Sequence, residues 1–505
     1  MTIRQRITDV VSEVFVQSII LLLYLCSPSF AIAQVHPRST AGLSPAELTT
    51  IMRAIDSPDL KSAFVGVQII DASTRSVLFS TNAHRMFEPA SCCKLLTSAA
   101  AMSILGIRYR FETKLELANI VNRQSSKPAD LILVGGGDPV LNTHDLTNLA
   151  QQLIGKISVI DRLEYYDRIF DRQRLGDGWA WDDEPYYYSP QISGLNCAEN
   201  VITISITPGV IDGPPKLLES PVLPQVRVVN KIVTVKGRNH TDVRYNRVEG
   251  RNVIKLSGTI SASAAGIEKV VIPLTFMHPG EMTAYLTISA LRSLGIKVIH
   301  SRPNQVKKLP TATEVVAEHY SVPLSQMLVL MNKPSDNLIA ECLLQAGGVA
   351  ATGRSTAGYD GTGLTASRAA LATFNVDLHQ LHQVDGSGLS RQDLVSPANL
   401  VNLLEALRTH KHFRYFYQSL PIAGVDGPLA WRMKNTRAAN NCHAKTGYLS
   451  GVSTIAGYVN GQDGTPFVFA IMINNHVCSE AACQLAQNTI IEMLANATTT
   501  RRSAP

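Results

Sequence analysis

Hydrophobic and polar positions follow a helical rhythm at the start of the chain and a strand-like rhythm soon after. Apolar residues recur at helical spacing over 48–55, directly after a capping box with proline at the first helical position, residues 44–47. Two short runs, Phe64–Ile70 and Ser76–Ser80, then predict a hairpin. An Ala- and Leu-rich helix is expected over Leu95–Leu105, where a glycine follows.

The middle of the chain, from about 111 to 310, is dominated by strand-like runs punctuated by Gly and Pro. One helix is expected here, with its apolar side chains between 146 and 153. The glycines of 135–139 lack the spacing of a nucleotide-binding loop and predict a turn. The expected strands are Phe111–Leu117, Leu131–Val134, Val201–Ile206, Val226–Lys236 and Val253–Leu256.

Helical periodicity returns from about 311, through Leu324–Leu330 and Leu338–Leu344. Val452–Val459 and Phe467–Ile473 then predict a hairpin, and Ser479 is placed to cap a final helix. The two ends of the chain therefore resemble each other, and the middle does not. We expect the terminal hairpins to join in one antiparallel sheet covered by the first and last helices, with the β-rich middle inserted.

Length and charge restrict the choice of function. The chain has 505 residues, enough for about two to four domains. Its 46 basic and 40 acidic residues give a net charge of only +6, without a Lys/Arg-rich block. Nucleic-acid binding is therefore not expected.

Residues 1–33 have the pattern of a secretory signal peptide. Positive charge precedes a mostly apolar run, Val14–Leu25, and Ala31-Ile32-Ala33 matches a cleavage site. An uncleaved anchor is the alternative, although the apolar run is short for a membrane span. Lipidation at Cys26 is disfavoured by the bulky Leu25 before it. We expect export to the periplasm or cell envelope, with no stable membrane span after processing.

Removing that signal leaves seven of the eight cysteines, so at least one is unpaired. Cys478 and Cys483 could bridge a short loop, whereas adjacent Cys92 and Cys93 are expected to pack inside a helix. No Cys-x-x-Cys or Cys/His metal spacing was found, and His379 and His382 have no second ligand cluster. The sequence thus predicts no metal and no cofactor.

Candidate chemistry begins at Ser91 and Lys94. A serine at a helix start, with a lysine one turn later on the same face, can form a nucleophile and its base when the lysine is desolvated. An N-cap serine followed by a solvated lysine is the alternative. Two further motifs decide between them: Ser335-Asp336-Asn337 before a helical run, and Lys445-Thr446-Gly447 before the last hairpin. In this order, the three motifs are the signature of penicillin-binding proteins and class A β-lactamases.

Around these motifs the chain resembles the D-alanyl-D-alanine carboxypeptidase/endopeptidase family S13 of low-molecular-mass penicillin-binding proteins. Similar blocks are Pro89–Lys94, Met331–Asn337, Asp385–Ser390, His443–Gly447, Gly136–Pro139 and Trp181–Asp183. The resemblance covers about residues 45–495. The long gap between the first two motifs fits the family, and the E-x-x-L-N deacylation motif of class A β-lactamases was not found.

The resemblance implies a penicillin-recognising α/β (α+β) fold, in which an antiparallel sheet with flanking helices and a helical subdomain carries β-rich inserts. The catalytic domain would be discontinuous, 40–110 with 311–500. The inserted 111–310 would divide into two domains, about 111–210 with 276–310, and about 211–275.

The resemblance also implies roles. Ser91 would attack the carbonyl of the penultimate D-alanine, Lys94 would accept its proton, and Ser335 would relay that proton to the leaving amine. Asn337 would orient Lys94 and the substrate.

Lys445 and Thr446 would hold the terminal carboxylate, and the backbone N–H groups of Ser91 and Tyr448 would form the oxyanion hole. Gly447 would lack a side chain so that the substrate can lie along the strand edge. The Asp385–Gly388 block is interpreted as a turn that borders the cleft, without a catalytic role.

The block Gly178–Tyr188 combines tryptophans, acids and tyrosines, which suits either a packed turn or a pocket for a cationic amine. The resemblance places an aspartate and an aromatic residue for the substrate's free ammonium group at Asp183 and Tyr188.

The expected function is therefore an exported serine DD-peptidase that acts on peptidoglycan stem peptides and is acylated by β-lactams. A serine β-lactamase and a non-catalytic wall-binding homologue are the alternatives. The balance of carboxypeptidase and endopeptidase action, the stem-peptide diamino acid and the oligomeric state stay open.

Overall fold

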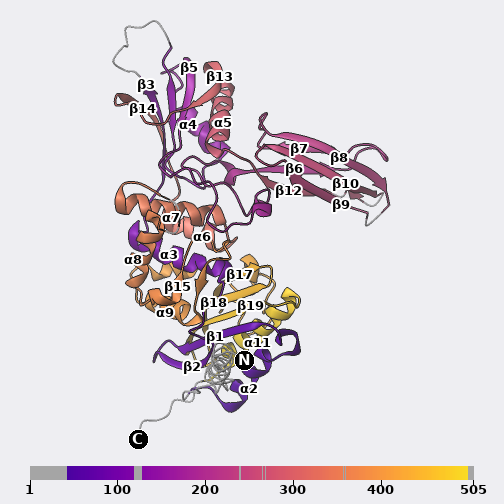
Figure 1. The fold of residues 1–505 in the computed structure, drawn as a ribbon, viewed down its shortest axis with the longest axis vertical. Helices are drawn as coiled ribbons and strands as arrows, with labels where there is room; N and C mark the ends of the chain where they lie inside the picture. Colours follow the sequence, from indigo (N-terminus) through magenta and orange to yellow (C-terminus); the bar gives the residue numbers. More distant parts are fainter. Residues whose placement is uncertain are drawn as a thin grey trace, which may run out of the picture. The chain divides into compact units, whose positions relative to one another are not determined.

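The computed structural model describes residues 42–498, except 119–127, 238–239, 264–265, 268, 357 and 359. In this part of the chain, strands from both ends form one antiparallel sheet in the order β17-β18-β19-β1-β2, which we call the terminal sheet (Figure 1). Its strands are β1 (Phe64–Asp71), β2 (Ser76–Thr81), β17 (His443–Leu449), β18 (Val452–Asn460) and β19 (Pro466–Asn474). The expected joining of the two terminal hairpins is confirmed.

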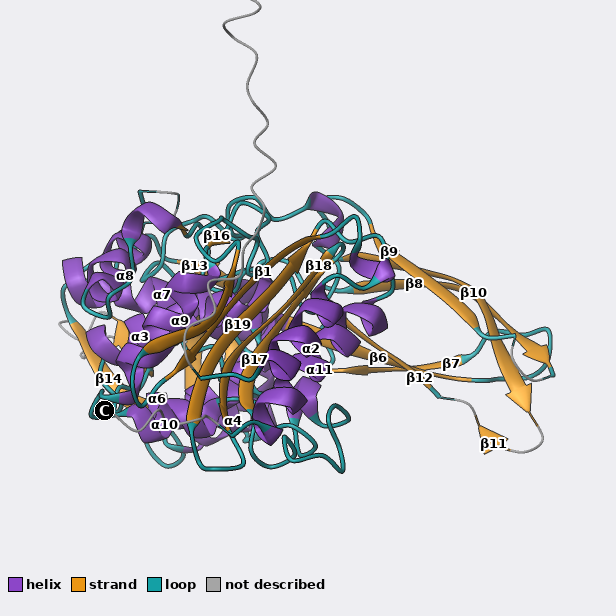
Figure 2. Ribbon diagram, turned by 90° about the horizontal axis from the view of Figure 1, so that it is seen from below, coloured by secondary structure: helices purple, strands orange, loops and turns teal. Residues whose placement is uncertain are grey.

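Strand β19 shows why this sheet has helices on both faces. Its alternate residues Phe467, Phe469, Ile471 and Ile473 belong to a core with α2 (Pro45–Ile55) and α11 (Glu480–Asn496). Val468, Ala470 and Met472 point into a second core that includes α3 (Cys93–Ile104) and α9 (Pro397–Arg408). Figure 2 shows α2 and α11 beside one face of the sheet. A continuous apolar run is what a strand buried on both faces requires.

The expected caps of the first and last helices are present. Ser44 Oγ accepts from Glu47 N at 3.3 Å while Glu47 Oε2 accepts from Ser44 N at 2.6 Å. Ser479 Oγ accepts from Ala482 N at 3.3 Å. Each contact satisfies a backbone group that the helix end would otherwise leave unpaired.

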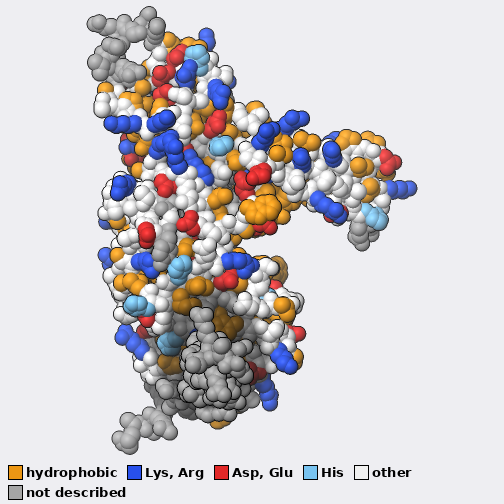
Figure 3. Space-filling view, viewed as in Figure 1, with side chains coloured by type: hydrophobic (Ala, Val, Ile, Leu, Met, Phe, Trp, Pro, Cys, Tyr) orange, Lys and Arg blue, Asp and Glu red, His pale blue; other side chains and the backbone are white. Residues whose placement is uncertain are grey.

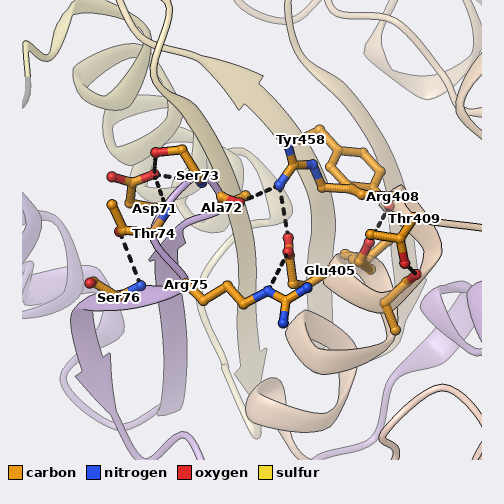
Figure 4. A network of polar contacts seen from close by, with 12 residues as sticks. Asp71, Ala72, Ser73, Thr74, Arg75, Ser76, Glu405, Arg408, Thr409 and Tyr458 are labelled. Carbon is orange, nitrogen blue, oxygen red and sulfur yellow. Dashed lines mark hydrogen bonds and ion pairs between the residues drawn. The ribbon is translucent and has the colours of Figure 1, made fainter.

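The β1–β2 turn is fixed to α9 by a polar network (Figure 4). Arg408 Nη1 donates to Ala72 O at 2.5 Å and to Glu405 Oε2 at 3.0 Å. Arg75 Nε donates to the other oxygen of Glu405 at 3.3 Å. Within the turn, Asp71 Oδ1 accepts from the backbone N–H of Ser73 at 2.8 Å. The network holds the hairpin against the helix that covers its inner face.

Further helices follow the inserted segment along the chain and come before β17. They are α6 (Leu324–Asn332), α7 (Asn337–Thr352), α8 (Thr362–Ala372) and α10 (Phe413–Ser419), with the short strands β15 (Leu381–His382) and β16 (Leu394–Val395) between α8 and α9. Among the described residues, no helix combines the length and apolar composition needed to span a bilayer.

The inserted region is β-rich, as expected. One mixed sheet has the order β13-β5-β4-β3-β14 and the helices α4 (Thr143–Gln151) and α5 (Pro279–Ser293). The other inserted strands form the order β12-β6-β7 and the set β11-β10-β8, with β9 paired to β10. Their bounds are β3 (Glu112–Ala118), β4 (Leu131–Val134), β5 (Val159–Tyr166), β6 (Val201–Thr207), β7 (Lys216–Ser220), β8 (Arg227–Lys236), β9 (Asp242–Arg247), β10 (Val253–Ser263), β11 (Gly266–Ile267), β12 (Val270–Thr275), β13 (Lys297–Gln305) and β14 (Thr313–Tyr320).

The strand pairing differs from the expected domain boundaries at two places. β14 pairs with β3, so the inserted sheet extends about ten residues past the expected boundary at 310. β6 lies in the domain that was expected to end at 210, but it pairs with β12 and β7, which lie in the domain expected to span 211–275. β14 lies at a sheet edge with only Ala317 buried, and its charged residues hide the strand pattern. The division into domains itself stays a prediction.

The sequence analysis also missed helix α5. Ten of its fifteen residues are buried, but Gly280, Thr283 and Thr287 are among them, so its buried side does not show an uninterrupted apolar periodicity. Its first residues, Pro279 and Gly280, are typical of a turn.

Candidate active site

The residues on either side of Ser91 contact two adjacent strands of the terminal sheet, β17 and β18. Cys92 Sγ contacts Lys445 O at 3.2 Å, and Thr454 Oγ1 donates to Pro89 O at 2.7 Å. Ala90 has φ +46°, a left-handed conformation that is costly for a side chain with a Cβ. A short 3₁₀ turn, Ala90–Cys92, leads directly into α3. Ser91 therefore lies at the start of a helix, as expected.

Lys94 follows one turn later and is fully buried, which decides against the alternative of a solvated lysine. Its Nζ lies 3.1 Å from Ser91 Oγ. It also lies 2.6 Å from Asn337 Oδ1 and 2.8 Å from Ser387 O. The structure thus brings the first motif and the asparagine of the second together.

These three contacts fit a neutral amine. A carbonyl oxygen and an amide oxygen can only accept, so they take the two hydrogens of an –NH₂ group. The oxygen assignment at Asn337 is fixed because its Nδ2 donates to Tyr188 O at 2.6 Å. The remaining lone pair of Lys94 faces the one partner that has a proton to give, the Ser91 hydroxyl. Burial, the largest effect, lowers the pKa of Lys94, while Asp385 and other nearby acids oppose the shift.

Ser335 and Asn337 flank the start of α7. Asp336 caps this helix, since its Oδ1 accepts from Ile339 N at 2.8 Å. Ser335 has φ +69°, the second non-glycine residue of the site in the left-handed region. Such conformations persist only where the surrounding structure holds them. The tight turn directs Ser335 toward β17, where its Oγ lies 3.0 Å from Lys445 Nζ.

Lys445 is also fully buried and donates to the backbone oxygen of Thr446 at 2.8 Å. Burial, followed by repulsion from Lys94, lowers the pKa of Lys445 to about 7. Further along β17, Thr446 is partly buried and Tyr448 is 63% exposed. The strand thus presents a buried cation at its inner end and an exposed ring at its outer end.

Gly447 is required for a reason that the sequence analysis did not give. A Cβ at this position would collide with Thr454 Oγ1 and Pro89 O. The glycine therefore allows β17 to pack against the segment before Ser91. The sequence analysis expected a glycine here so that a substrate could reach the strand edge, and this role stays a prediction.

The turn at 385–388 holds Lys94, a contribution that the sequence analysis did not assign to it. Besides accepting from Lys94 through Ser387 O, this turn packs so closely on the Ser91 loop that a Cβ at Gly388 would collide with Ala90 O. Asp385 Oδ1 accepts from Ser387 N at 3.0 Å and from Gly388 N at 2.6 Å. In the sequence, the glycines that follow Asp385 were the signal that the backbone of this turn could pack closely against another segment.

Glu341 on α7 supports the same turn from the other side. Its Oε1 accepts from Gly386 N at 3.0 Å and from Ser387 N at 2.8 Å. Burial and the neighbouring Asp385 raise the pKa of Glu341 to about 8, and the same two causes raise the pKa of Asp393. A single acid inside the apolar run Leu338–Leu344 was the signal that could have identified Glu341, because a charge there must be buried.

The inserted region reaches the site through the block 178–188. Trp179 Nε1 donates to Asp385 Oδ2 at 2.9 Å. Tyr188 OH donates to Asp183 Oδ1 at 2.8 Å, and Tyr188 O is the acceptor for Asn337. Tyr188 therefore contacts the site directly through its backbone oxygen, and Asp183 is connected to the site through the Tyr188 hydroxyl. Asp182 beside them is exposed.

Charges of both signs are interspersed on the face shown in Figure 3. This distribution agrees with the small net charge of +6. An extended single-sign surface, which nucleic-acid binding uses, is not seen on this face.

The chain is similar to known proteins in sequence and in fold. The model of the D-Ala-D-Ala carboxypeptidase 3 (S13) family matches residues 48–497. A D-alanyl-D-alanine carboxypeptidase of Actinomadura sp. (strain R39) is 34% identical over 458 residues, which cover 86% of this chain and 83% of that protein. The D-alanyl-D-alanine carboxypeptidase DacB of Haemophilus influenzae is 24% identical over 86% of this chain and 90% of its own length. The crystal structure of penicillin binding protein 4 (dacB) from Haemophilus influenzae superimposes with a TM-score of 0.78 at 23% identity, covering 88% of this chain and 99% of that one.

Proposed function

The chain belongs to the D-Ala-D-Ala carboxypeptidase 3 (S13) family, and on that premise we propose how its residues carry out the reaction. It is a serine DD-peptidase of the penicillin-recognising fold. The observation that carries the proposal is the set of contacts at Lys94 Nζ, two acceptors and the Ser91 hydroxyl.

In the first half-reaction, Ser91 Oγ attacks the carbonyl carbon of the penultimate D-alanine as its proton moves to Lys94. The backbone N–H groups of Ser91 and Tyr448 receive the developing oxyanion, each typically worth about 10²–10³ in rate. Collapse of the tetrahedral intermediate breaks the peptide bond. The leaving amine takes a proton through Ser335, which Lys445 holds in place.

In the second half-reaction, water attacks the acyl group on Ser91, and Lys94 serves again as the base. A β-lactam forms the same acyl bond, but its leaving group stays tethered. Deacylation is then slow, which gives the inhibition expected of a penicillin-binding protein. The absence of the E-x-x-L-N motif from the sequence supports this assignment over a β-lactamase.

Recognition of the terminal carboxylate is assigned to Lys445 and Thr446. A buried ammonium beside a partly exposed hydroxyl on a strand edge can bind a carboxylate with charge-assisted hydrogen bonds. Asp183 and Tyr188 are proposed to contact a free ammonium group on the substrate's diamino-acid side chain. We also propose that residues 1–33, which lie outside the described residues, direct export to the periplasm or cell envelope, where peptidoglycan is the substrate.

Penicillin labelling tests the assignment of Ser91. After incubation with benzylpenicillin, mass spectrometry should find one adduct, on the peptide that contains Ser91. Ser91→Ala should abolish it, while the half-buried Ser76→Ala serves as a matched control. An adduct on another serine, or none in a folded sample, would exclude Ser91 as the nucleophile. Intact labelling also distinguishes the enzyme from a non-catalytic wall-binding homologue.

A further inference from the structure

A second cluster of reactive side chains lies where β19 leads into α11, outside the site described above. His476, Cys478 and Cys483 each have a ligand atom within 4.8 Å of those of the other two. Cys478 Sγ lies 3.6 Å from Cys483 Sγ and 3.8 Å from His476 Nδ1. His476 and Cys483 are buried, with exposed fractions of 8% and 0%, and Cys478 is half-buried.

The two separations from Cys478 Sγ match the edges of a tetrahedron around zinc. Zn–S bonds of about 2.3 Å and Zn–N bonds of about 2.0 Å give tetrahedral ligand–ligand distances of about 3.5–3.8 Å. Cys478 is thus spaced as a ligand relative to both other groups, and it is the half-buried member of the cluster.

The second ring nitrogen of His476 supplies an independent observation. Nε2 is buried without a hydrogen-bond partner, and it lies 3.9 Å from Glu480 Oε2, which is buried and unpartnered as well. Nδ1 lies 3.2 Å from Cys478 O, an oxygen that can only accept, so this contact places the proton on Nδ1. Metal binding through Nδ1 requires the proton to move to Nε2, where it faces a carboxylate oxygen. A histidine ligand oriented by a carboxylate is the usual arrangement at zinc sites.

Glu480 is itself held in place. Its Oε1 accepts from Ser453 Oγ at 2.8 Å and from Gln484 Nε2 at 3.2 Å. His476 N donates to Gly451 O at 3.2 Å. The cluster therefore connects the start of α11 to the β17–β18 turn, at the far end of the strand that carries Lys445.

We propose that His476 Nδ1, Cys478 Sγ and Cys483 Sγ bind one Zn²⁺ ion, with Glu480 orienting the histidine and water completing the tetrahedron. Binding replaces two S–H bonds by two Zn–S bonds and releases two protons to solvent. Two thiolates and one imidazole favour zinc over calcium or magnesium, which prefer oxygen ligands. The expectation of no metal arose because His-x-Cys-x₄-Cys differs from the spacings of the common zinc motifs.

Cobalt titration tests this site on the full mature protein after reduction and removal of metals by a chelator. We expect one equivalent of Co²⁺ to give a thiolate-to-cobalt charge-transfer band, and Zn²⁺ to displace it. Cys478→Ser, at a half-buried position, should abolish the band while the protein stays folded. Glu480→Gln should weaken binding by roughly 10–100-fold. His379→Gln, at an exposed histidine, should bind like the parent.

Two further measurements complete the test. Zn²⁺ should raise the Tm of the parent but not of Cys478→Ser. Protein isolated without reductant should contain one zinc per chain, with both thiols open to alkylation after chelation. A Cys478–Cys483 disulfide in that protein, the absence of the cobalt band, or equal binding by Cys478→Ser would each overturn the proposal.

Discussion

Lys94 and Asn337 are separated by 243 positions in the chain, yet Lys94 Nζ lies 2.6 Å from Asn337 Oδ1. The contact joins the helix that begins at the nucleophile to the helix that begins after the inserted region. It occupies one hydrogen of the amine, and Ser387 O occupies the other. These two acceptors leave the lone pair of a neutral Lys94 directed at Ser91, and burial favours that neutral form by lowering the pKa of Lys94.

The first prediction follows from the lowered pKa of Lys94. A base acts in its deprotonated form, so acylation by a β-lactam should accelerate as pH rises through this pKa, below the 10.5 of an ordinary lysine. Lys94→Met should slow acylation by about 10²–10⁴-fold and remove this dependence. The exposed Lys61→Ala is the control. Stopped-flow acylation rates across pH check both effects, and parental rates in Lys94→Met would assign the proton to another group.

The second prediction concerns Lys445, whose pKa is lowered to about 7. A carboxylate is attracted only by the protonated amine, which is lost as pH rises through this value. KM for a peptide with a free terminal carboxylate should therefore increase above about pH 7. The matching peptide methyl ester, which lacks that charge, should show no such increase. The comparison of KM between the two substrates checks the assignment. Equal pH dependence would show that Lys445 does not bind the carboxylate.

The third prediction concerns Asp385, a positioning residue that acts through the turn holding Lys94. Asp385→Asn replaces an acceptor oxygen by an amide that faces backbone N–H donors, at a cost of about 1–3 kcal/mol for each buried group left unpaired. We expect a lower Tm and a fall in kcat of acylation larger than any change in KM.

Trp179→Phe is a milder form of the same change, because it removes only the donor to Asp385 Oδ2. Trp431→Phe, at an 84% exposed tryptophan, is the matched control. Thermal denaturation and single-turnover acylation measure both effects. Parental kinetics in Asp385→Asn would show that the turn does not depend on this carboxylate.

The terminal sheet could be predicted because β19 is a continuous apolar run and because Ser44 and Ser479 are recognisable helix caps. The fold class followed from the resemblance that the three motifs carry. Helix α5 and strand β14 were missed because one buries threonines and a glycine among its apolar residues and the other carries charged residues at a sheet edge. At the site, three motifs were recognisable from their side chains. The contribution of Ser387 could not be recognised from the sequence, because Ser387 contacts Lys94 through a backbone oxygen, which every residue type has. Backbone contacts of this kind become visible only in three dimensions.

The fourth prediction concerns the N-terminal segment, which lies outside the described residues. If Ala31-Ile32-Ala33 is a cleavage signature, the mature protein should begin near Gln34. N-terminal sequencing of the envelope fraction measures this directly, and Ala33→Arg should leave the precursor uncleaved. Retention of Met1 on most of the envelope-bound protein would favour an uncleaved anchor.

The last prediction concerns specificity for a substrate amine. If Asp183 binds the ammonium group, Asp183→Ala should lower kcat/KM for peptides with a free side-chain amine, and leave acylation by penicillins without that amine almost unchanged. The hydrogen bond from Tyr188 to Asp183 makes a second outcome possible, because Tyr188 O also holds Asn337. Loss of that bond would slow both substrates alike. Asp182→Ala, at the exposed neighbour, separates the two cases. A selective loss in Asp182→Ala, together with equal losses in Asp183→Ala, would make Asp183 a structural residue and move amine recognition to Asp182.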